Sequence, residues 1–507
     1  MADTKREIER KYESDESGLP DLTGVAGVAT VIDKGVAHLD AVYYDTADER
    51  LAAASLTLRR RTGGSDAGWH LKVPVAPGVR DEIREPLSDT VPRTLAGLVR
   101  SRVREAELLP AVRLRSDRDV RHLVDAQGKL LAEVSVDAVH AERLTDGGGT
   151  AQWTEIEVEL ADDGDPAFLD KVEKRLRKAG VRPSSSASKL ARALAETRPS
   201  GSGKKKRKAP PAPEEPSTAG DHVLAYVRAQ RDAILELDPA VRQDAYDSVH
   251  RMRVATRRMR STFRSYGKVL DRTITDPIGE ELRWLAGELG VDRDREVMTE
   301  RLTTVLGELP RTLISGPIRT RLRTWANARR GGSRRRLIGV LDSKRYLALL
   351  DTLDALVAEP PLLPDAAGKP EKVIGKAVRK DFGKVSALVE EAMEAPPGPD
   401  RDLALHEARK KAKRTRYAAE AATPALGASA RALAKSMKSL TSLLGDHQDS
   451  VMVRVTLREL SAVAHAAGES SFTYGVLYGR EEQRAAGVEA ALPEVWKGIV
   501  AEGSVQA

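Results

Sequence analysis

The sequence predicts a multidomain α+β protein, with an antiparallel β-sheet or barrel in its N-terminal part and an all-α region in its C-terminal part. The chain has 507 residues, more than one hydrophobic core usually serves. Before residue 199 apolar residues recur with the period of strands, and after residue 220 with the period of helices. Residues 199–220 are rich in Gly, Ser, Pro and charge and cannot bury a core. We therefore expect domains at residues 1–198 and 221–501, joined by a mobile basic, proline-rich linker at 199–220.

The composition narrows the class of protein. Hydrophobic residues make up 41% and charged residues 31% of the chain, and the formal net charge is +7, so strongly basic surfaces must be local. Aromatic residues make up only 4%, which disfavours single-stranded nucleic acid binding by base stacking. The chain contains no cysteine, which excludes disulfides and thiolate metal sites. The N-terminus lacks the apolar segment of a signal peptide, so we expect a cytoplasmic protein that does not enter a membrane.

The N-terminal part contains seven segments that alternate with period two, several of them separated by glycine-rich turns, and three shorter helical stretches. Many short strands with turns between them are typical of an antiparallel sheet or barrel. The expected strands are residues 7–12, 55–61, 68–75, 79–85, 111–118, 129–139 and 152–160, and the expected helices are residues 94–104, 166–179 and 188–197.

Charged side chains share one face of these strands. Glu7, Glu9 and Lys11 alternate on the first strand, and two carboxylates on one face repel unless a cation lies between them. In a closed sheet this face would line a lumen, where cations can bind a phosphate chain and clustered glutamates can hold Mg²⁺ or Mn²⁺. The alternative is an ordinary sheet with one solvated face and cross-strand ion pairs. The other residues in this phase are Arg59, Arg61, His70, Lys72, Arg80, Glu82, Arg84, Arg113, Arg115, Glu155, Glu157 and Glu159.

The C-terminal part is expected to be helical throughout, with a proline-rich break at residues 360–370 that divides it into units of about 221–359 and 371–501. The expected helices are residues 221–236, 244–270, 279–289, 294–306, 318–329, 344–358, 372–395, 403–422, 429–444, 450–467 and 470–489.

Residues 248–264 form a cationic amphipathic helix that reappears at residues 405–420. In the first copy the charged stripe begins at His250, and in the second it begins at His406, with cations at the same offsets. Cations at one-turn spacing repel one another unless a polyanion lies along them, and arginine binds phosphate oxygens in bidentate geometry. A solvated charged face is the alternative, but it gives no reason for the duplication. The stripes comprise His250, Arg253, Arg257, Arg260 and Arg264, and His406, Arg409, Lys413 and Arg416.

The repeat extends beyond the cationic helices. The sequence LGVDRD at residues 289–294 corresponds to LGDHQD at residues 444–449, at nearly the same separation as the two histidines. Two copies of one helical unit should pack with pseudo-two-fold symmetry and bring both stripes to one groove. We interpret Asp294 and Asp449 as N-caps of the helices that follow.

Both parts resemble known families. Residues 1–198 resemble the CYTH superfamily of triphosphate tunnel metalloenzymes, whose signature Glu-x-Glu-x-Lys appears here at residues 7–11. Residues 58–61, 70–72 and 155–159 resemble its later strands, and residues 188–190 its late lysine-bearing element. Residues 221–501 resemble the CHAD domain, or conserved histidine α-helical domain. That resemblance rests on His250, Arg253, Arg257, Arg258 and Arg260, and on His406, Arg409, Lys413, Arg414 and Arg416.

The resemblance implies an eight-stranded antiparallel β-tunnel followed by a bundle of two four-helix units. CYTH relatives use a divalent metal to hydrolyse inorganic or thiamine triphosphate, or to cyclise ATP, and CHAD relatives bind inorganic polyphosphate. One position departs from the family pattern: Thr57 stands where many relatives place a lumen arginine, and Arg59 and Arg61 are expected to replace its charge.

We expect hydrolysis of a triphosphate, with Mg²⁺ or Mn²⁺ at the glutamates, beside a noncatalytic polyphosphate site. Assigned roles are catalysis for Lys11, Arg59 and Lys72, metal binding for Glu7, Glu9, Glu155 and Glu157, and tunnel substrate binding for Arg61, Arg80, Arg84, Arg113, Arg115 and Lys189. Polyphosphate binding is assigned to His250, Arg253, Arg257, Arg258, Arg260, Arg264, His406, Arg409, Lys410, Lys413, Arg414 and Arg416.

Three other functions stay open. The protein could be a nonenzymatic polyphosphate binder with an inactive tunnel, an adenylate cyclase, or a nucleic acid binder that uses the basic run at residues 204–208. Phosphate release, cyclic AMP formation and competition by DNA or RNA distinguish them. Binding of polyphosphate also predicts association with polyphosphate granules. The sequence does not predict the oligomeric state.

Overall fold

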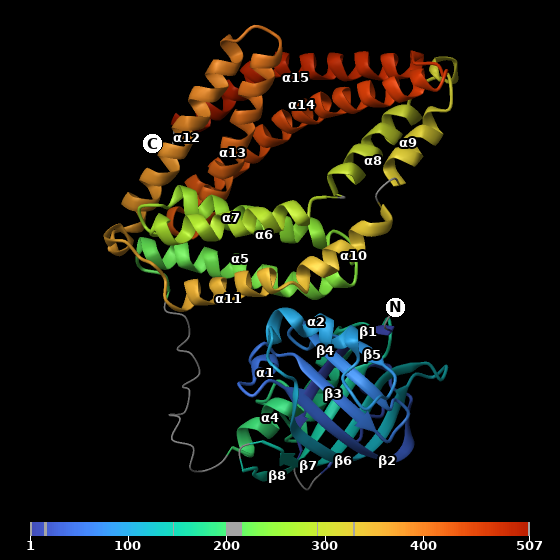
Figure 1. Ribbon diagram of the computed structural model, residues 1–507. Coiled ribbons are helices and arrows are strands. Elements are labelled where there is room, and N and C mark those ends of the chain that lie inside the picture. The colour runs from blue at the N-terminus through green and yellow to red at the C-terminus, as the bar shows by residue number, and fades with distance from the viewer. Residues whose placement is uncertain are drawn as a thin grey trace. The chain divides into compact units, whose positions relative to one another are not determined.

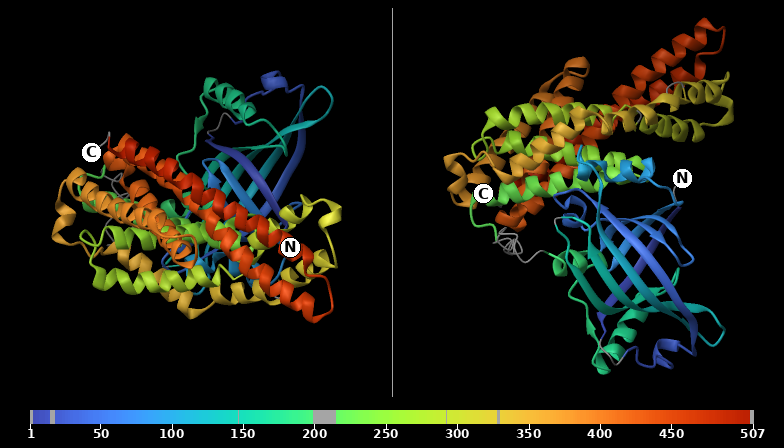
Figure 2. Two further views of the ribbon diagram at one scale, coloured as in Figure 1. Left: turned by 90° about the horizontal axis from the view of Figure 1, so that it is seen from above. Right: turned by 60° about the horizontal axis from the view of Figure 1, so that its bottom comes forward.

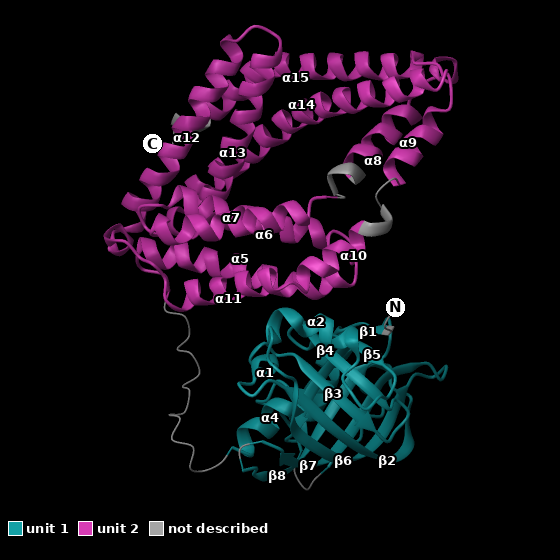
Figure 3. Cartoon of the chain, in the orientation of Figure 1, with its two compact units in different colours: residues 1–208 teal, residues 209–507 magenta. Residues whose placement is uncertain are grey.

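The computed structural model describes residues 3–14, 18–145, 147–198, 215–291, 293–327 and 330–504, without the side chains of 293–296, 330–332 and 502–504 (Figure 1). The chain divides into two compact units, Met1–Lys208 and Ala209–Ala507 (Figure 3). Most of the predicted linker, residues 199–214, lies outside the described residues. The last two residues of its predicted range belong to a helix, because Thr218 and Asp221 form a capping box that starts the helix at Ala219.

The first unit is a closed eight-stranded antiparallel barrel, as the fold class predicted. The strand order is β5-β4-β3-β2-β6-β7-β8-β1, and pairing of β1 with β5 closes the barrel. The short β9 pairs with the end of β1. The strands are β1 Asp3–Glu13, β2 Thr30–Asp45, β3 Thr57–Thr62, β4 Gly68–Ala76, β5 Val79–Glu85, β6 Leu109–Val124, β7 Leu130–Arg143, β8 Thr150–Leu160 and β9 Arg182–Pro183.

The sequence analysis did not predict β2, although it pairs with β6 along almost its whole length. Only the last seven residues of β2 alternate between buried and partly exposed positions, and most of its first nine are exposed. A register shift between Asp33 and Gly35 interrupts the strand further. A strand exposed on both faces has no period-two signal, so the hydrophobic pattern did not indicate it.

Helices cover the apolar outer face of the barrel. Leu58, Leu71 and Ile83 on β3 to β5 pack with Leu95 and Val99 of α2 (Arg93–Val103) in one buried cluster. A second cluster joins β1, β7 and β8 to α3 (Ala167–Lys178). Burial of each leucine or isoleucine contributes about 1.5–3 kcal/mol, so these helices support the barrel from outside and leave its lumen to polar side chains.

One end of the barrel is closed by α4 (Lys189–Glu196). Leu190 and Leu194 of this helix pack on Tyr43, Val112 and Trp153. Strands β6 and β8, which carry Val112 and Trp153, also place charged side chains in the lumen farther along. The hydroxyl oxygen of Ser188 caps the helix by accepting a hydrogen bond from the backbone amide of Ala191 at 3.1 Å. Apolar packing of α4 therefore closes one end of the barrel, and the lumen itself is lined mainly by charged side chains up to Lys189.

The second unit is all-helical and contains three cores. Helices α5, α6, α7 and α11 surround the largest one, and α12 to α15 surround the second. The third joins α8 and α9 to the far ends of α14 and α15, which run side by side as a long pair (Figures 1 and 2). The helices are α5 Ala219–Arg242, α6 Ser248–Ser265, α7 Arg272–Glu288, α8 Arg293–Gly307, α9 Ile318–Asn327, α10 Arg330–Leu341, α11 Lys344–Ala358, α12 Pro370–Glu394, α13 Pro399–Leu426, α14 Ala428–Ala466 and α15 Phe472–Ser504.

Helix α14 differs from its prediction. It runs unbroken where two helices were expected, so the interpretation of Asp449 as an N-cap is wrong. Gly445 costs an α-helix only about 1 kcal/mol, and packing on both sides of it holds the helix straight through this point. In the first copy the chain does break after Gly290, and α8 begins at Arg293, but the side chain of Asp294 lies outside the described residues.

Candidate functional site

The barrel encloses a cavity of about 290 Å³ that is lined mainly by charged side chains. Strands β1 and β8 contribute half of its carboxylates, and β3, β5 and β6 contribute its arginines. Asp162, which is 77% exposed, lies at its rim, and Lys189 of α4 lies at its closed end. Ten predicted site residues line the cavity: Glu7, Glu9, Lys11, Arg59, Arg61, Lys72, Arg80, Arg84, Glu157 and Lys189.

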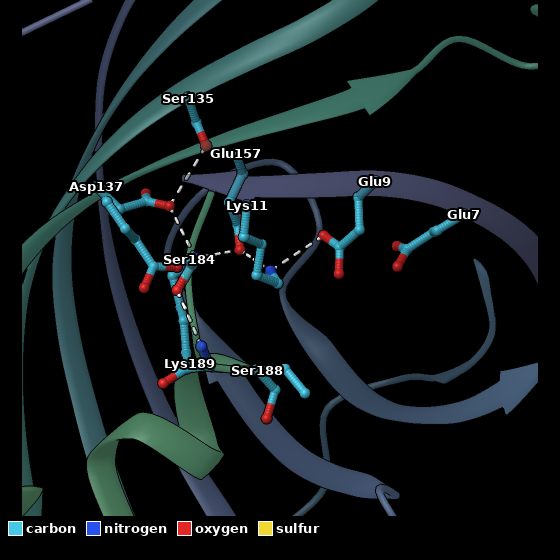
Figure 4. A network of polar contacts seen from close by, with 12 residues as sticks. Glu7, Glu9, Lys11, Ser135, Asp137, Glu157, Ser184, Ser188 and Lys189 are labelled. Atoms are coloured by element: carbon cyan, nitrogen blue, oxygen red, sulfur yellow. Dashed lines mark hydrogen bonds and ion pairs between the residues drawn. The ribbon is translucent and has the colours of Figure 1, made fainter. Parts of the chain in front are cut away.

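Glu7 and Glu9 project from β1 into the cavity, and both are buried (Figure 4). Glu9 lies directly opposite Glu159 of β8. Burial raises the pKa of Glu7, and the charges of Glu82 and Glu159 raise it further, although Lys72 opposes them from 2.5 Å. This part of the wall therefore carries closely spaced carboxylates whose ionised forms are stabilised by any additional cation.

Lys11 links the two acidic strands. Its Nζ lies 3.2 Å from Oε2 of Glu9 on β1 and also contacts Oε1 of Glu157 on β8 (Figure 4). Burial alone would lower the pKa of Lys11, but Glu157 and Glu9 raise it above its ordinary value. The lysine is therefore charged at neutral pH and positioned beside the carboxylates of β1.

A second acidic cluster lies at the closed end. One carboxylate oxygen each from Asp137, Glu155 and Glu157 come within 4.8 Å of one another. Nζ of Lys189 lies among them, at 2.9, 2.8 and 2.6 Å respectively. Arg118 adds ion pairs of 2.7 Å to both Asp137 and Glu157. Oxygen donors suit a divalent cation, but here an ammonium group already occupies the position between them.

Glu82 lies among basic side chains of the cavity wall and is only 1% exposed. Its carboxylate oxygens lie 2.5 Å from Nη2 of Arg84, 3.6 Å from Nη2 of Arg59 and 3.7 Å from Nζ of Lys72. His70 contacts it at 2.9 Å through Nδ1 and contacts the carbonyl oxygen of Asp66 at 2.9 Å through Nε2. Burial opposes ionisation of Glu82, but these donors and cations lower its pKa well below the ordinary value. One buried anion thus orients several lumen cations.

Arg61 is buried beside Asp66, whose carboxylate it contacts. Burial lowers the pKa of Arg61 to about 9, and Arg59 and Arg118 contribute by charge repulsion. Thr57, Arg59 and Arg61 all line the cavity from one face of β3. The two arginines thus lie in the lumen next to the threonine, as expected. Repulsion among buried guanidinium groups favours binding of an anion between them.

In the helical unit, α6 and α13 pack against each other. The hydroxyl of Tyr266 donates a hydrogen bond to the carbonyl oxygen of Ala418 at 2.6 Å, and Arg258 reaches Glu420 at 2.9 Å. Burial lowers the pKa of Lys413 to about 8, with repulsion from Arg409 and Arg257 contributing. Arg257 belongs to α6 and the other two to α13, so these parts of the two cationic stripes lie near each other. We call the two stripes together the groove of the helical unit.

The duplicated glycines lie beside the duplicated arginines. A Cβ atom added to Gly290 would lie 2.7 Å from Nη2 of Arg253, and one added to Gly445 would lie 3.4 Å from Nη2 of Arg409. Nδ1 of His406 lies 2.6 Å from Oε1 of Gln448. The two halves of the repeat thus use the same pairing, in which a glycine leaves room for a guanidinium.

Comparison with known proteins agrees with this architecture. A family model described as the CYTH domain matches residues 5–194, and one described as the CHAD domain matches residues 225–458. The chain belongs to the CYTH–CHAD proteins. An uncharacterized protein of Mycobacterium tuberculosis is 40% identical over 513 residues, covering 97% of each chain.

Two solved structures are similar to the chain. PptA from Streptomyces chartreusis is 21% identical and covers 56% of this chain and 99% of its own, with a TM-score of 0.47. The CHAD domain from the plant Ricinus communis is 23% identical and covers 57% of this chain and 93% of its own, with a TM-score of 0.44. Within the described part of the chain, no helix has the length and apolar character needed to cross a membrane.

Two predicted tunnel residues of the CYTH domain do not reach the cavity. Arg113 is 38% exposed and forms an ion pair with Asp40 at 2.5 Å, and Arg115 is more exposed. The opposite face of β6 points inward, where it carries Val112 near α4 and Arg118 farther along. The prediction chose the wrong phase because the inward residues near α4 are apolar. It missed Arg118 and Asp137, and it placed Glu82 on the charged face without assigning it a role.

Several predicted residues of the CHAD groove are engaged in ion pairs. Arg414 reaches Asp381 of α12 at 3.2 Å, and Arg264 reaches Glu280 of α7 at 3.8 Å. Lys410 lies 2.5 Å from Glu407 on its own helix, and Arg416 lies 2.9 Å from Glu420. Burial lowers the pKa of Arg260, and Arg264 adds to this effect. The charges of Arg257 and Arg409 act on Lys413 across the two stripes, and we take these three residues as the centre of the groove.

The CHAD domain also contains a mixed cluster of Asp402, His447 and Glu489. Nε2 of the buried His447 lies 3.4 Å from the first carboxylate and 3.3 Å from the second. Arg454 lies 3.6 Å from Asp402, and Arg401 lies 2.8 Å from Glu489. Because both carboxylates already have arginine partners, this cluster is an ion network that joins α13, α14 and α15.

Proposed function

We propose that this CYTH–CHAD protein binds inorganic polyphosphate and that its tunnel is a divalent-metal-dependent triphosphatase. The observation that carries the proposal is the division of one buried cavity into two walls. Glu7 and Glu9 on β1 offer oxygen donors for a hard cation. Arg59 and Lys72 face the same space from β3 and β4 and suit the oxygens of a phosphate chain.

Glu7 and Glu9, both buried in the cavity wall, are the first candidates for holding Mg²⁺ or Mn²⁺. The fit rests on the raised pKa of Glu7, because a cation would relieve its unfavourable ionisation. Glu155 and Glu157, the other predicted ligands, surround Lys189, so a metal ion there would have to displace Nζ. When bound, a divalent ion supplies charge neutralisation and orients water.

The chain's own residues then bind and position the substrate. Arg59, Arg61, Lys72, Arg80, Arg84 and Arg118 all line the cavity and would hold the phosphate oxygens and stabilise charge that develops on them. Lys11 would donate to the terminal phosphate from its position beside Glu9. Since α4 closes one end, the cavity fits the end of a phosphate chain rather than its middle.

The CHAD groove would supply a second, noncatalytic site. Arg257 of α6 and Arg409 and Lys413 of α13 concentrate positive charge in a small region. Nearby acidic groups do not restore the pKa of Lys413 to its ordinary value. An inorganic polyphosphate chain would relieve this repulsion along both stripes. This site would retain substrate near the tunnel or direct the protein to polyphosphate granules.

Phosphate release from inorganic triphosphate, measured with Mg²⁺ and with Mn²⁺, tests the enzymatic part. We expect the intact chain to release phosphate and the Glu7→Ala/Glu9→Ala variant to release none. Arg113→Ala is the matched control, since Arg113 lies outside the cavity, and it should retain activity. Absence of release from the intact chain, together with tight polyphosphate binding, would make the protein a nonenzymatic binder.

One observation favours the nonenzymatic alternative. Lys11 and Lys72 already form ion pairs with Glu9 and Glu7, the two proposed metal ligands. The cyclase alternative has less support. Tyr43 is the one aromatic side chain that lines the cavity among the described residues, so an adenine ring would meet a mostly charged surface.

A further inference from the structure

Helix α12 carries four lysines at intervals of four residues: Lys372, Lys376, Lys380 and Lys384. All four are exposed. Residues four apart lie on one side of a helix about 6 Å apart along its axis, so these side chains form a continuous row. We call this row the lysine ladder. It is separate from the two cationic stripes of α6 and α13.

The ladder has almost no acidic compensation. Among the described residues, no carboxylate lies within ion-pair distance of Lys372, Lys376 or Lys380, and Lys384 reaches only Asp381, at 3.5 Å. Asp381 also accepts a hydrogen bond from the hydroxyl of Ser265 at 2.6 Å and pairs with Arg414. Like charges four residues apart on a helix destabilise it.

The charge order along α12 is also unfavourable for an isolated helix. Three of the four lysines lie in its N-terminal half, where Glu371 is the acidic residue of the first turn, and Glu390, Glu391 and Glu394 lie near its C-terminus. Helix ends favour the opposite arrangement, because the N-terminus carries partial positive charge and the C-terminus partial negative charge. Helix stability therefore gives no reason for the ladder.

The corresponding helix of the first repeat, α5, does not carry such a row. Its Arg231 pairs with Asp232 at 2.7 Å and with Asp354 at 2.6 Å, and its Arg242 pairs with Asp238 at 2.7 Å and with Asp342 at 2.6 Å. The cations of α5 are thus used to join helices within the bundle. The uncompensated row is a property of the second copy alone.

The ladder is continuous with basic residues of α13. Burial lowers the pKa of Lys411, and repulsion from Arg414, Lys384 and Lys410 contributes, so the last lysine of the ladder lies near α13. Lys410 follows Arg409 of the groove directly in sequence and is itself exposed. Positive charge therefore extends from the groove, over Lys410 and Lys411, to α12.

We propose that the lysine ladder is a second anion-binding surface, which holds the part of an inorganic polyphosphate chain that extends beyond the CHAD groove. This inference rests on the proposed binding of polyphosphate by the groove. A row of exposed ammonium groups attracts phosphate charges without recognising or stacking on bases, so it suits a flexible chain of phosphates. Long chains would contact groove and ladder together, and short chains would contact the groove alone.

The test replaces all four ladder lysines with glutamine in the full chain. The matched control removes the same charge from four exposed lysines elsewhere in the CHAD domain, at Lys268, Lys344, Lys435 and Lys497. The affinities for long-chain polyphosphate, for triphosphate and for duplex DNA are measured at several salt concentrations, with Arg253→Ala/Arg409→Ala as the groove variant.

We expect the ladder variant to bind triphosphate like the intact chain and to bind long chains more weakly. The slope of log affinity against log salt for long chains should fall by about 3, since each phosphate contact contributes about 0.7–0.9 to such slopes. The groove variant should lose affinity for long chains but keep the triphosphate binding of the tunnel, and the control variant should keep both affinities.

Three results would overturn the inference. Unchanged long-chain binding by the ladder variant would leave the groove as the whole site. Equal weakening of long-chain binding by the control variant would reduce the effect to net charge. Loss of DNA binding with unchanged polyphosphate binding would assign the ladder to nucleic acid. In contrast, an intact chain that binds no polyphosphate would refute the proposed function of the groove itself, and the ladder proposal with it.

Discussion

Lys189 at the first position of α4 lies 2.6 Å from Oε1 of Glu157 on β8, inside a cluster that also contains Asp137 and Glu155. The ion pairs join the helix that closes the barrel to the strands that form its wall. Burial opposes the charge of Lys189, but the three carboxylates raise its pKa far above the ordinary value. Closure of the tunnel and stability of its acidic wall therefore depend on the same side chain.

We expect Lys189→Met to destabilise the CYTH domain strongly. The change leaves Asp137, Glu155 and Glu157 without their shared cation, and breaking a buried pair in this way costs about 3–5 kcal/mol of unfolding free energy. Lys5→Met is the control, because its pair with Glu159 is partly exposed and such pairs contribute about 1 kcal/mol or less. Urea unfolding of the full chain measures both, and equal losses would contradict the prediction.

The Glu82→Gln variant should be less stable but should gain more from an anionic ligand. The carboxylate contributes stability above its ordinary pKa of 4.5, and that contribution is lost as the pH falls through its lowered folded-state value. Its removal leaves Arg59, Lys72 and Arg84 to repel one another. We expect a lower Tm at pH 7 and a larger rise on adding triphosphate than in the intact chain.

Asp81→Asn is the control for this experiment, since Asp81 precedes Glu82 on β5 but pairs outside the cavity with Arg6 at 2.8 Å. A ligand-induced rise in Tm that is no larger for Glu82→Gln than for Asp81→Asn would show that Glu82 does not restrain the lumen cations.

Polyphosphate binding by the CHAD groove should weaken as the pH rises from 7 to 9. The pKa of Lys413 is lowered from 10.5 to about 8, so the side chain loses its charge within this range. A ligand that favours the charged form must therefore bind more tightly below pH 8. Lys413→Arg should remove most of this pH dependence, because arginine stays protonated. Isothermal titration calorimetry at several pH values measures the effect.

The lowered pKa of Lys413 also predicts how the stability of the CHAD domain without ligand depends on pH. Unfolding returns Lys413 to its ordinary pKa of 10.5, so the unfolded chain binds more protons between about pH 8 and 10.5. The contribution of this lysine to unfolding free energy therefore rises with pH across that window. A contribution that falls there would contradict the burial of Lys413 beside Arg257 and Arg409.

Alanine at Gly290 should weaken polyphosphate binding more than alanine at Gly445. The added Cβ would lie 2.7 Å from Arg253 in the first case and 3.4 Å from Arg409 in the second, so only the first arginine must move. Displacement of one charge-assisted contact costs about 1.5–3 kcal/mol of binding. Gly445 lies within α14, where Gly→Ala ordinarily stabilises a helix by about 0.5–1 kcal/mol. Affinity and Tm of both variants provide the measurement.

The sequence predicted the barrel and most of its lumen because the charged face repeats with period two from Glu7 to Glu159. It did not predict β2, whose first half is exposed on both faces. It placed Arg113 and Arg115 in the lumen because alternation defines two faces of a strand but not which one points inward. Val112 and Arg118 share the inward face, and only the position of α4 explains why one is apolar and the other charged.

In the helical unit, the repeat predicted the most specific feature of the groove. The parallel between Gly290 and Gly445 was visible in the sequence, and each glycine lies beside the arginine of its own copy. The continuous α14 was not predicted, because the LGDHQD segment resembles a helix break when it is compared with LGVDRD of the first copy. Tertiary packing by α15 on both sides of this segment decides the outcome.

Closure of the barrel by α4 has a consequence for the order of events in turnover. A lumen with one mouth obliges each product to depart along the path by which the substrate arrived. If the tunnel hydrolyses triphosphate as proposed, the pyrophosphate left after each cleavage would delay admission of the next triphosphate and compete with it for the same arginines. Egress, rather than cleavage, would then set the pace of the enzyme at high substrate concentration.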